Sequence, residues 1–576
     1  MQLDVKIAGG TIFDGTGADA YTADIGIIGG RIVEIGRIAT VATRTISADG
    51  AMVTPGFIDT HTHYDAQSLW DSHLINSAMN GVTTAVMGNC GVGCAPLSPE
   101  IVPQVKSLLE GVEDIPGQAL DAAIDWNWDT FGSYLSRIEE RPHAINLASN
   151  ATHAPIRLKV MGARALDGSA PSGDDIAQMQ ALLEEALTAG ACAFSTDRIA
   201  LHQLSDGSHV PDWHAPSDEL LALTRTLTRF PGRPLQFASD FGGTVGTEDD
   251  TLRELALLRD ITALGAPVLT PMQQYPKVAG GWRRLASEIA AMTTAGARIS
   301  LEASARAIGS LMGLEQFHPF LRHPTYMDIR SLPLAERLVR MRDPEVRARL
   351  LSEEPAPDPN DQMASYKFEI LANQADRIFI VDGTPDYEPD PATSVKAIAE
   401  REGRTVYEVF YDALIANEGR HFLYLIVFNF GNGNLDEQHA ILSLPDTMFS
   451  FGDAGAHVTA ACDFANTTFA LIHWGRDRAR GFRKESIVHR LTGAQARFFG
   501  FRDRGEVRLG AYADLNVIAF DRLKLTPPRL LHDFPGGAKR LHQGASGYLA
   551  TFVRGAPIVE ADELTGELPG RLLRSK

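Results

Sequence analysis

The stretch TPGFIDTHTH, residues 54–63, ends an apolar strand-like run with two histidines one residue apart. Successive side chains of a strand alternate between its two faces, so His61 and His63 are expected to point in the same direction. Two imidazoles directed into the mouth of a barrel can bind one cation. A bare His-x-His more often marks two surface histidines, but the preceding strand and its Pro-Gly start favour a metal site here.

A second strand-like run, TMFSFGDAGAH at residues 447–457, ends in an acid among small residues. An Asp at the end of a late strand can reach both a cation and a water beside it, which suits Asp453 as a metal ligand and general base. The alternative for Asp453 is an ordinary turn or helix N-cap. Cys90 follows the apolar run VTTAVM at residues 82–87 and could add a thiolate ligand, or be a small buried side chain.

Outward from these segments, strand-like runs alternate with stretches of helical period between about residues 55 and 500. This alternation predicts a parallel sheet with crossover helices, here a TIM-like (β/α)8 barrel. The span is much longer than the roughly 250 residues of a plain barrel, so large insertions are expected in its loops. The largest is placed near residues 311–391, where it could serve as a lid or as a dimer contact.

The two ends of the chain have a different pattern, with short glycine-bounded strands in residues 1–54 and again in residues 501–576. They are expected to build one small β-sandwich outside the 55–500 barrel.

The overall composition is that of a globular protein, with 44% hydrophobic and 22% charged residues. A net charge of −19 disfavours nucleic acid as a partner. The absence of a long apolar run and of a signal-peptide pattern predicts a cytosolic protein that does not enter membranes. Four cysteines are too few for a disulfide framework in so long a chain, so reduced thiols are expected.

The sequence resembles the N-acyl-D-amino-acid deacylases, or D-aminoacylases, of the amidohydrolase superfamily, as a longer and divergent branch. The resemblance rests on PGFIDTHTHYD (55–65), GNCG (88–91), VMG (160–162), FGDAGAH (451–457) and GAYADLNV (510–517). It implies zinc held by His61 and His63, a bridging thiolate from Cys90, and a catalytic carboxylate from Asp453. Asp453 would deprotonate the attacking water and later protonate the leaving amine.

The chain departs from that family in two middle strands. D-aminoacylases supply two further zinc-binding histidines there, whereas the corresponding segments read LQFASDF (235–241) and PVLTPMQQ (267–274), without histidine. One or two zinc ions therefore remain open at this point, and a single-zinc site is one of the alternatives.

Other polar residues are candidates for contacts with the metal or the substrate. His153 and His202 are placed near strand ends and could contact either, while His457 is read as a structural neighbour of Asp453. Four basic side chains are candidates for binding a substrate carboxylate, although such groups are more often surface charges: Arg157, Arg198, Lys277 and Arg306.

The predicted function is a zinc-dependent hydrolase that cleaves the amide bond of an N-acyl-D-amino acid or a similar small amide. The alternatives are lactone or cyclic-amide hydrolysis, or metal-dependent decarboxylation, on the same scaffold, because fold alone does not select the chemistry. A non-catalytic scaffold is a further alternative. The partner is expected to be a small-molecule substrate, and homo-oligomerisation is left open.

Overall fold

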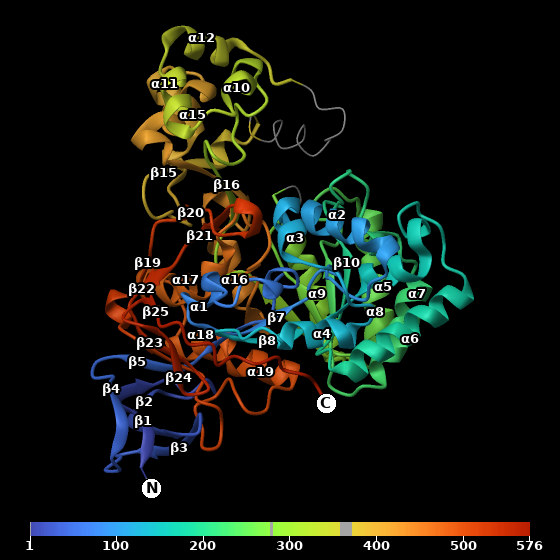
Figure 1. Ribbon diagram of the computed structural model, residues 1–576, viewed down its shortest axis with the longest axis vertical. Coiled ribbons are helices and arrows are strands. Elements are labelled where there is room, and N and C mark those ends of the chain that lie inside the picture. The colour runs from blue at the N-terminus through green and yellow to red at the C-terminus, as the bar shows by residue number, and fades with distance from the viewer. Residues whose placement is uncertain (1, 277–279, 357–370, 372) are drawn as a thin grey trace.

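The computed structural model describes residues 2–276, 280–356, 371 and 373–576, and its centre is a ring of parallel strands (Figure 1). The strands are β6 (Phe57–Asp59), β7 (Val82–Met87), β8 (Asn146–Ser149), β9 (Ala151–Thr152), β10 (Phe194–Arg198), β11 (Leu235–Ser239), β12 (Val268–Pro271), β13 (Ile299–Ala303) and β17 (Thr447–Phe449). Each pairs in parallel with its neighbour, in one three-stranded and one six-stranded sheet. Only Asn150 separates β8 from β9, so the two act as one interrupted strand.

The first and last strands of this ring are joined just beyond their carboxyl ends. A parallel bridge links Thr62 to Ala454. The His63 amide donates to the Ala454 carbonyl at 2.8 Å, and the Asp453 amide donates to the His61 carbonyl at 3.0 Å. With β8 and β9 counted as one, the six-stranded and three-stranded sheets supply eight strands, which confirms the predicted (β/α)8 barrel.

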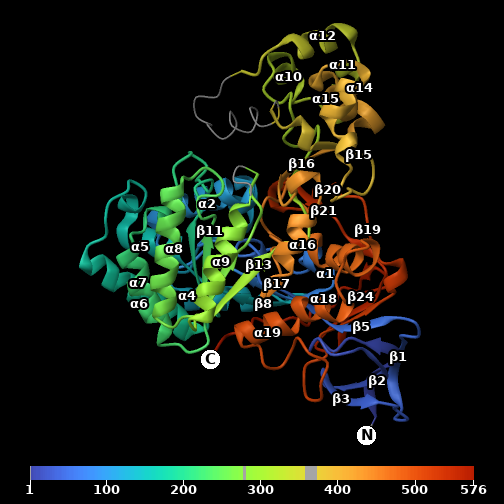
Figure 2. The ribbon, with the colours of Figure 1, turned by 180° about the vertical axis from the view of Figure 1, so that it is seen from behind.

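Helices following the strands cover the outer face of the barrel (Figures 1 and 2). The principal ones are α5 (His153–Met161), α6 (Gly173–Ala189), α7 (Ser217–Thr228), α8 (Glu248–Ala263) and α9 (Gly281–Thr294). Their starts are encoded locally: capping boxes pair Ser172 with Asp175 in α6 and Thr247 with Asp250 in α8. Other helices near the barrel are α1 (Ile75–Ala78), α2 (Val102–Glu113), α3 (Gly117–Ala123), α4 (Phe131–Glu139), α16 (Asp436–Leu442), α17 (Asn466–Phe469), α18 (Lys484–Leu491) and α19 (Gly493–Phe499).

The two ends of the chain build one β domain, as predicted. Its nine-stranded sheet contains β1 (Leu3–Ile12), β2 (Tyr21–Ile28), β3 (Arg31–Gly36), β4 (Ala42–Ser47), β5 (Met52–Pro55), β18 (Leu515–Ile518), β23 (Tyr548–Val553), β24 (Ala556–Glu560) and β25 (Glu563–Leu564). The antiparallel pairing of β5 with β18 joins the two termini. Apolar side chains from both, including Val53, Val517 and Phe552, share one buried cluster.

A separate lobe is inserted between β13 and β17, and it projects from one end of the molecule (Figures 1 and 2). It contains β14 (Ile308–Met312), β15 (Ile378–Val381), β16 (Phe422–Phe428), α10 (Pro324–Ile329), α11 (Leu334–Met341), α12 (Pro344–Ser352), α14 (Val395–Glu402) and α15 (Val406–Ile415). These elements have a hydrophobic core of their own. Residues 357–370 and 372, within the predicted 311–391 insertion, lie outside the described residues, and the proposed domain bounds stay predictions.

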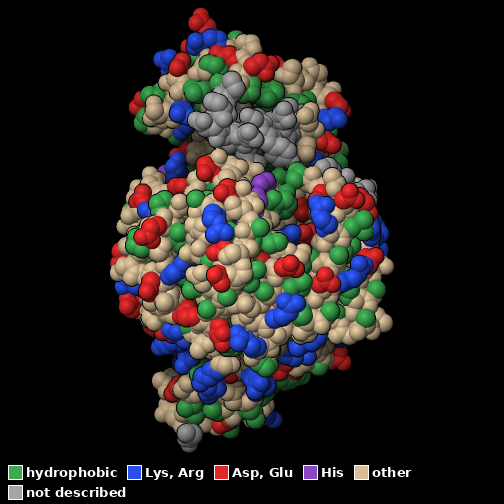
Figure 3. All heavy atoms as spheres, turned by 90° about the vertical axis from the view of Figure 1, so that its right-hand side faces the viewer, with side chains coloured by type: hydrophobic (Ala, Val, Ile, Leu, Met, Phe, Trp, Pro, Cys, Tyr) green, Lys and Arg blue, Asp and Glu red, His purple; other side chains and the backbone are tan. Residues whose placement is uncertain are grey.

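Acidic and basic side chains are interspersed over the face of the molecule seen in Figure 3. None of the helices in the described ranges is long and apolar enough to cross a bilayer.

Candidate metal centre

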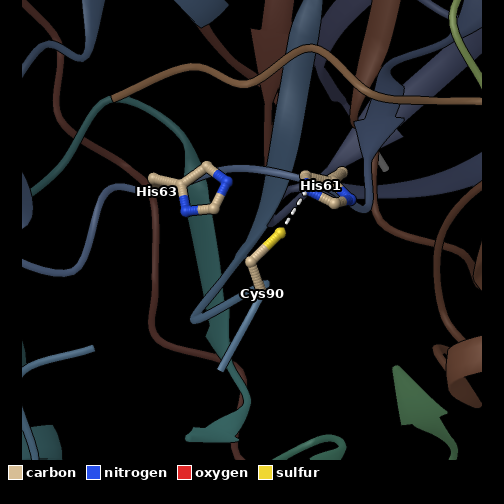
Figure 4. A group of neighbouring side chains, drawn as sticks. All are labelled: His61, His63 and Cys90. Atoms are coloured by element: carbon tan, nitrogen blue, oxygen red, sulfur yellow. Dashed lines mark hydrogen bonds between the residues drawn. The ribbon is translucent and has the colours of Figure 1, made fainter. Parts of the chain in front are cut away.

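His61, His63 and Cys90 converge at the carboxyl ends of β6 and β7 (Figure 4). One ligand atom from each lies within 4.8 Å of the others, and it is the one such group of three among the residues described. All three side chains are buried. The strand alternation that predicts a common direction for His61 and His63 therefore agrees with their placement.

The Cys90 thiol is held in the cluster by an unusual backbone. Cys90 has φ of 52°, in the left-handed region, and its Sγ lies 3.4 Å from His61 Nε2. Burial raises the pKa of this thiol. His61 and His63 lower the pKa by a larger amount together, so the net pKa is below its usual value. The shift is toward the thiolate, which is the form that binds metal.

Asp453 joins the cluster from the loop after β17, which is hydrogen-bonded to the His61–His63 segment where the barrel closes. Its Oδ1 is 3.5 Å from His61 Nε2 and 3.5 Å from His63 Nε2. Burial alone would raise its pKa, yet the two histidines hold the pKa at about 2. A Cβ at Gly455 would lie 2.5 Å from the His63 carbonyl, so glycine is needed where this loop packs against the histidine segment.

Two buried carboxylates stand behind the histidines. Glu302, on β13, contacts His61 Nδ1, and Glu113, at the end of α2, lies 2.8 Å from His63 Nδ1 without the alignment of a good hydrogen bond. With Nδ1 of each ring facing an acid, Nε2 of each ring faces the cluster.

Sequence reasoning missed both of these acids. Glu302 gave a usable signal, as a carboxylate in the apolar strand ISLEA, whereas Glu113 lies in a loop helix with no local pattern to mark it.

The donor set fits a divalent cation. Two imidazole nitrogens, a thiolate and a carboxylate oxygen match the ligand chemistry and coordination number of zinc. Four acids surround only two imidazoles: Cys90, Asp453, Glu113 and Glu302. Buried acidic groups in this number need positive charge beside them, which the two imidazoles or a metal ion can supply.

The middle strands present amides at their carboxyl ends. Gln236, on β11, accepts a hydrogen bond at 3.1 Å from the Cys90 amide, and its own Nε2 is buried without a partner among the described residues. Gln273, just after β12, accepts a 2.6 Å bond from Asn429. Neither segment adds an imidazole to the centre.

His153 and Arg157 are not part of the cluster and belong to a buried network around Glu219. His153 bonds to Thr196 at 2.9 Å and to Glu219 at 2.8 Å, and Arg157 bonds to the same acid at 2.9 Å. Both side chains are buried. Their hydrogen bonds form a buried network that links α5 to β10 and to Glu219 of α7.

The other candidate cations are also engaged by the protein. Arg198 pairs with Glu254 at 2.8 Å. Arg306 pairs with Asp463 at 2.7 Å and stacks on Tyr387 at 3.8 Å. Lys277 lies outside the described residues, and the assignment of these side chains to a substrate carboxylate stays a prediction.

Comparison with known protein families, sequences and structures identifies relatives of this chain. The amidohydrolase family profile matches residues 44–559. A D-aminoacylase of Alcaligenes xylosoxydans xylosoxydans is 26% identical, covering 100% of this chain and 98% of its own length. An N-acyl-D-aspartate deacylase from the same organism is 35% identical over 39% of this chain and 41% of its own.

Among solved structures, the N-acyl-D-glutamate deacylase of Bordetella bronchiseptica, determined with zinc and a phosphonate inhibitor, is similar over 100% of both chains. The TM-score is 0.65 and the identity is 25%. These matches confirm the resemblance to the D-aminoacylases predicted from the motifs.

Proposed function

Because the chain belongs to the amidohydrolase family, we propose that it hydrolyses the amide bond of an N-acyl-D-amino acid or a similar small amide at a single zinc ion. The family membership makes it a metal-dependent enzyme acting on carbon–nitrogen bonds other than peptide bonds. Its relatives include a D-aminoacylase, an N-acyl-D-aspartate deacylase and an N-acyl-D-glutamate deacylase, and these names support this substrate class.

The convergence of His61, His63, Cys90 and Asp453 on one point carries the proposal. These four side chains would hold the ion. When bound, zinc supplies Lewis acidity toward the scissile carbonyl and lowers the pKa of an attacking water. The middle-strand amides, with Gln236 bonded to the Cys90 backbone, favour one ion over two.

Asp453 is the proton carrier in this proposal. Its side chain is 13% exposed, so it can meet substrate, whereas the acids behind the histidines are 2% exposed or less. The carboxylate accepts a proton from the attacking water and delivers it to the leaving nitrogen. Glu302 and Glu113 keep the two imidazoles oriented while this proton moves.

Metal analysis and substrate profiling test the proposal together. The purified chain should contain one zinc per molecule and should release free amino acid from N-acetyl-D-amino acids faster than from their L-isomers. Two tightly bound ions would contradict the single-zinc site. Full zinc occupancy with no turnover of any N-acyl amino acid would reject deacylation.

A second candidate is lactone or cyclic-amide hydrolysis, or metal-dependent decarboxylation, at the same site. The absence of histidine from segments 235–241 and 267–274 favours it, since the polar groups available there then differ from those of a D-aminoacylase. The same purified enzyme, offered lactones, hydantoins and carboxylated ring compounds, distinguishes these reactions by product.

A further inference from the structure

A buried aspartate at the end of β10 pairs with a partly exposed histidine in the loop that follows this strand. Asp197 is buried at the end of that strand, and its Oδ1 accepts a 2.7 Å hydrogen bond from the Ile199 amide. Its Oδ2 contacts Nδ1 of His202. The imidazole is therefore fixed by one nitrogen, and its Nε2 makes no hydrogen bond to the described residues, on a side chain that is 21% exposed.

This pair is packed against the turn that carries the metal-binding thiol. The Asp197 amide donates to Asp212 Oδ2 at 2.6 Å. A Cβ at Gly91 would lie 2.0 Å from that same oxygen and 3.0 Å from the Asp197 nitrogen. Residue 91, directly after Cys90, therefore has to be glycine for the two segments to meet, so the pair lies directly against the Cys90 turn.

The surroundings of His202 favour its cationic form. Burial tends to lower its pKa, but Asp197 raises it to about 9, with smaller contributions from Cys90 and Glu113. A fixed imidazolium with one free N–H is a good ligand for an anionic oxygen. The neighbouring Arg198 cannot serve in the same way while both its Nε and Nη2 are bonded to Glu254.

We propose that His202, positioned by Asp197, binds the carboxylate of the substrate and selects acylated amino acids over neutral amides. This inference rests on the proposed deacylase function. In this assignment Nε2–H of His202 donates to the carboxylate, while Asp197 is a positioning residue that does not touch substrate. The acyl group and its scissile bond lie toward the Cys90 and Asp453 side.

The test compares N-acetyl-D-leucine with N-acetyl-D-leucinamide, which share the scissile bond and differ in the carboxylate. His202→Gln keeps a hydrogen-bond donor but loses the charge. KM for the carboxylate substrate should rise about 10- to 100-fold, since hydrogen bonds to charged groups are worth more than neutral ones, with kcat nearly unchanged. Kinetics on the leucinamide should not change. His209→Gln, in the same loop and stacked on Trp213, is the matched control.

Other outcomes separate the inference from the function on which it rests. An equal loss on both substrates would assign His202 a structural role, and no change on either would remove it from binding; both overturn the inference. If the wild-type chain hydrolyses neither compound, nor any other N-acyl amino acid, the deacylase proposal fails. Isothermal titration of the two compounds into zinc-loaded wild type and His202→Gln then decides: preference for the carboxylate, lost in the variant, supports the inference, and equal binding overturns it.

Discussion

Glu302 and Glu113 influence the metal centre without being ligands. Glu302 contacts Nδ1 of His61 and so fixes the tautomer and the direction of that ring, whereas Glu113 faces Nδ1 of His63 at 2.8 Å without the alignment of a good hydrogen bond. The imidazoles then approach the cation already oriented, and the acid makes each nitrogen a better donor. The proposed centre therefore involves six side chains, four as ligands and two behind the histidines.

Replacing Glu302 with glutamine should weaken zinc binding by about 10- to 100-fold, because the amide neither orients nor polarises His61 as a carboxylate does. Competition with a chromogenic zinc chelator measures the change. Glu345→Gln, on the exposed surface of α12, is the control and should leave the affinity as it is. Equal affinities for the Glu302 variant and the control would show that this acid does not support the site.

Asp453→Asn should reduce kcat by about 10²- to 10⁴-fold, the usual contribution of a general acid–base group. Most of the metal should remain, because His61, His63 and Cys90 still converge in the variant. Turnover and zinc content are measured on the same preparation. Normal turnover by a fully folded Asp453→Asn chain would exclude the carboxylate from proton transfer.

How far the centre could be predicted depends on the residue. His61, His63 and Asp453 stand at strand ends, where alternation and barrel geometry say which way they point. Cys90 needed the resemblance, because a lone buried cysteine is common. Glu113 and Gln236 could not be found, since their contacts with His63 and Cys90 depend on packing between distant segments.

The lobe between β13 and β17 has an acid-sensitive element in its core. His318 is buried, and its Nδ1 accepts a 3.2 Å hydrogen bond from the Phe320 amide. Its ring meets Tyr326 edge-on at 4.4 Å. Burial, with the nearby charges of Arg337 and His323, lowers its pKa to about 3. The imidazole is therefore neutral in the folded lobe.

Acid should loosen this lobe. The folded pKa is below the unfolded value, so the unfolded state binds the extra proton and stability is lost as pH falls below about 6.5. The slope from this one group is at most about 1.4 kcal/mol per pH unit. Hydrogen exchange of the lobe at pH 7 and pH 5 measures it. His318→Gln should flatten the dependence, and an unchanged slope in that variant would assign the acid sensitivity to other groups.

At the level of elements, the sequence located the β6 and β17 strands well because each ends in a distinctive motif. The lobe was harder to delimit. Its strand β16 pairs antiparallel with β14 and with β15, in a sheet separate from the barrel. Such pairing joins segments distant in sequence, so local alternation does not predict it.

On the scale of the whole molecule, the β domain ties the two ends of the chain together. Leu515→Ala should lower the free energy of unfolding by about 2–5 kcal/mol, since Leu515 is buried where β18 meets both β5 and β23. Leu509→Ala is the matched control, because Leu509 is 61% exposed. Urea denaturation compares the two, and similar losses would show that the β18 junction contributes little.

The overall architecture was the most predictable part. The repeated strand and helix pattern indicated the barrel, and glycine-bounded strands at both ends indicated one β domain. The closure of the barrel could not be read from sequence, because it depends on a single bridge between residues 62 and 454.

That bridge joins an early segment of the chain to a late one. Synthesis proceeds from the N-terminus, so His61, His63 and Cys90 leave the ribosome early, whereas Glu302 and Asp453 follow much later. A nascent chain therefore contains the two imidazoles and the thiol before Glu302 and Asp453 have been synthesised. The full set of side chains around the two imidazoles is therefore complete only when the final strand has reached its place at the bridge.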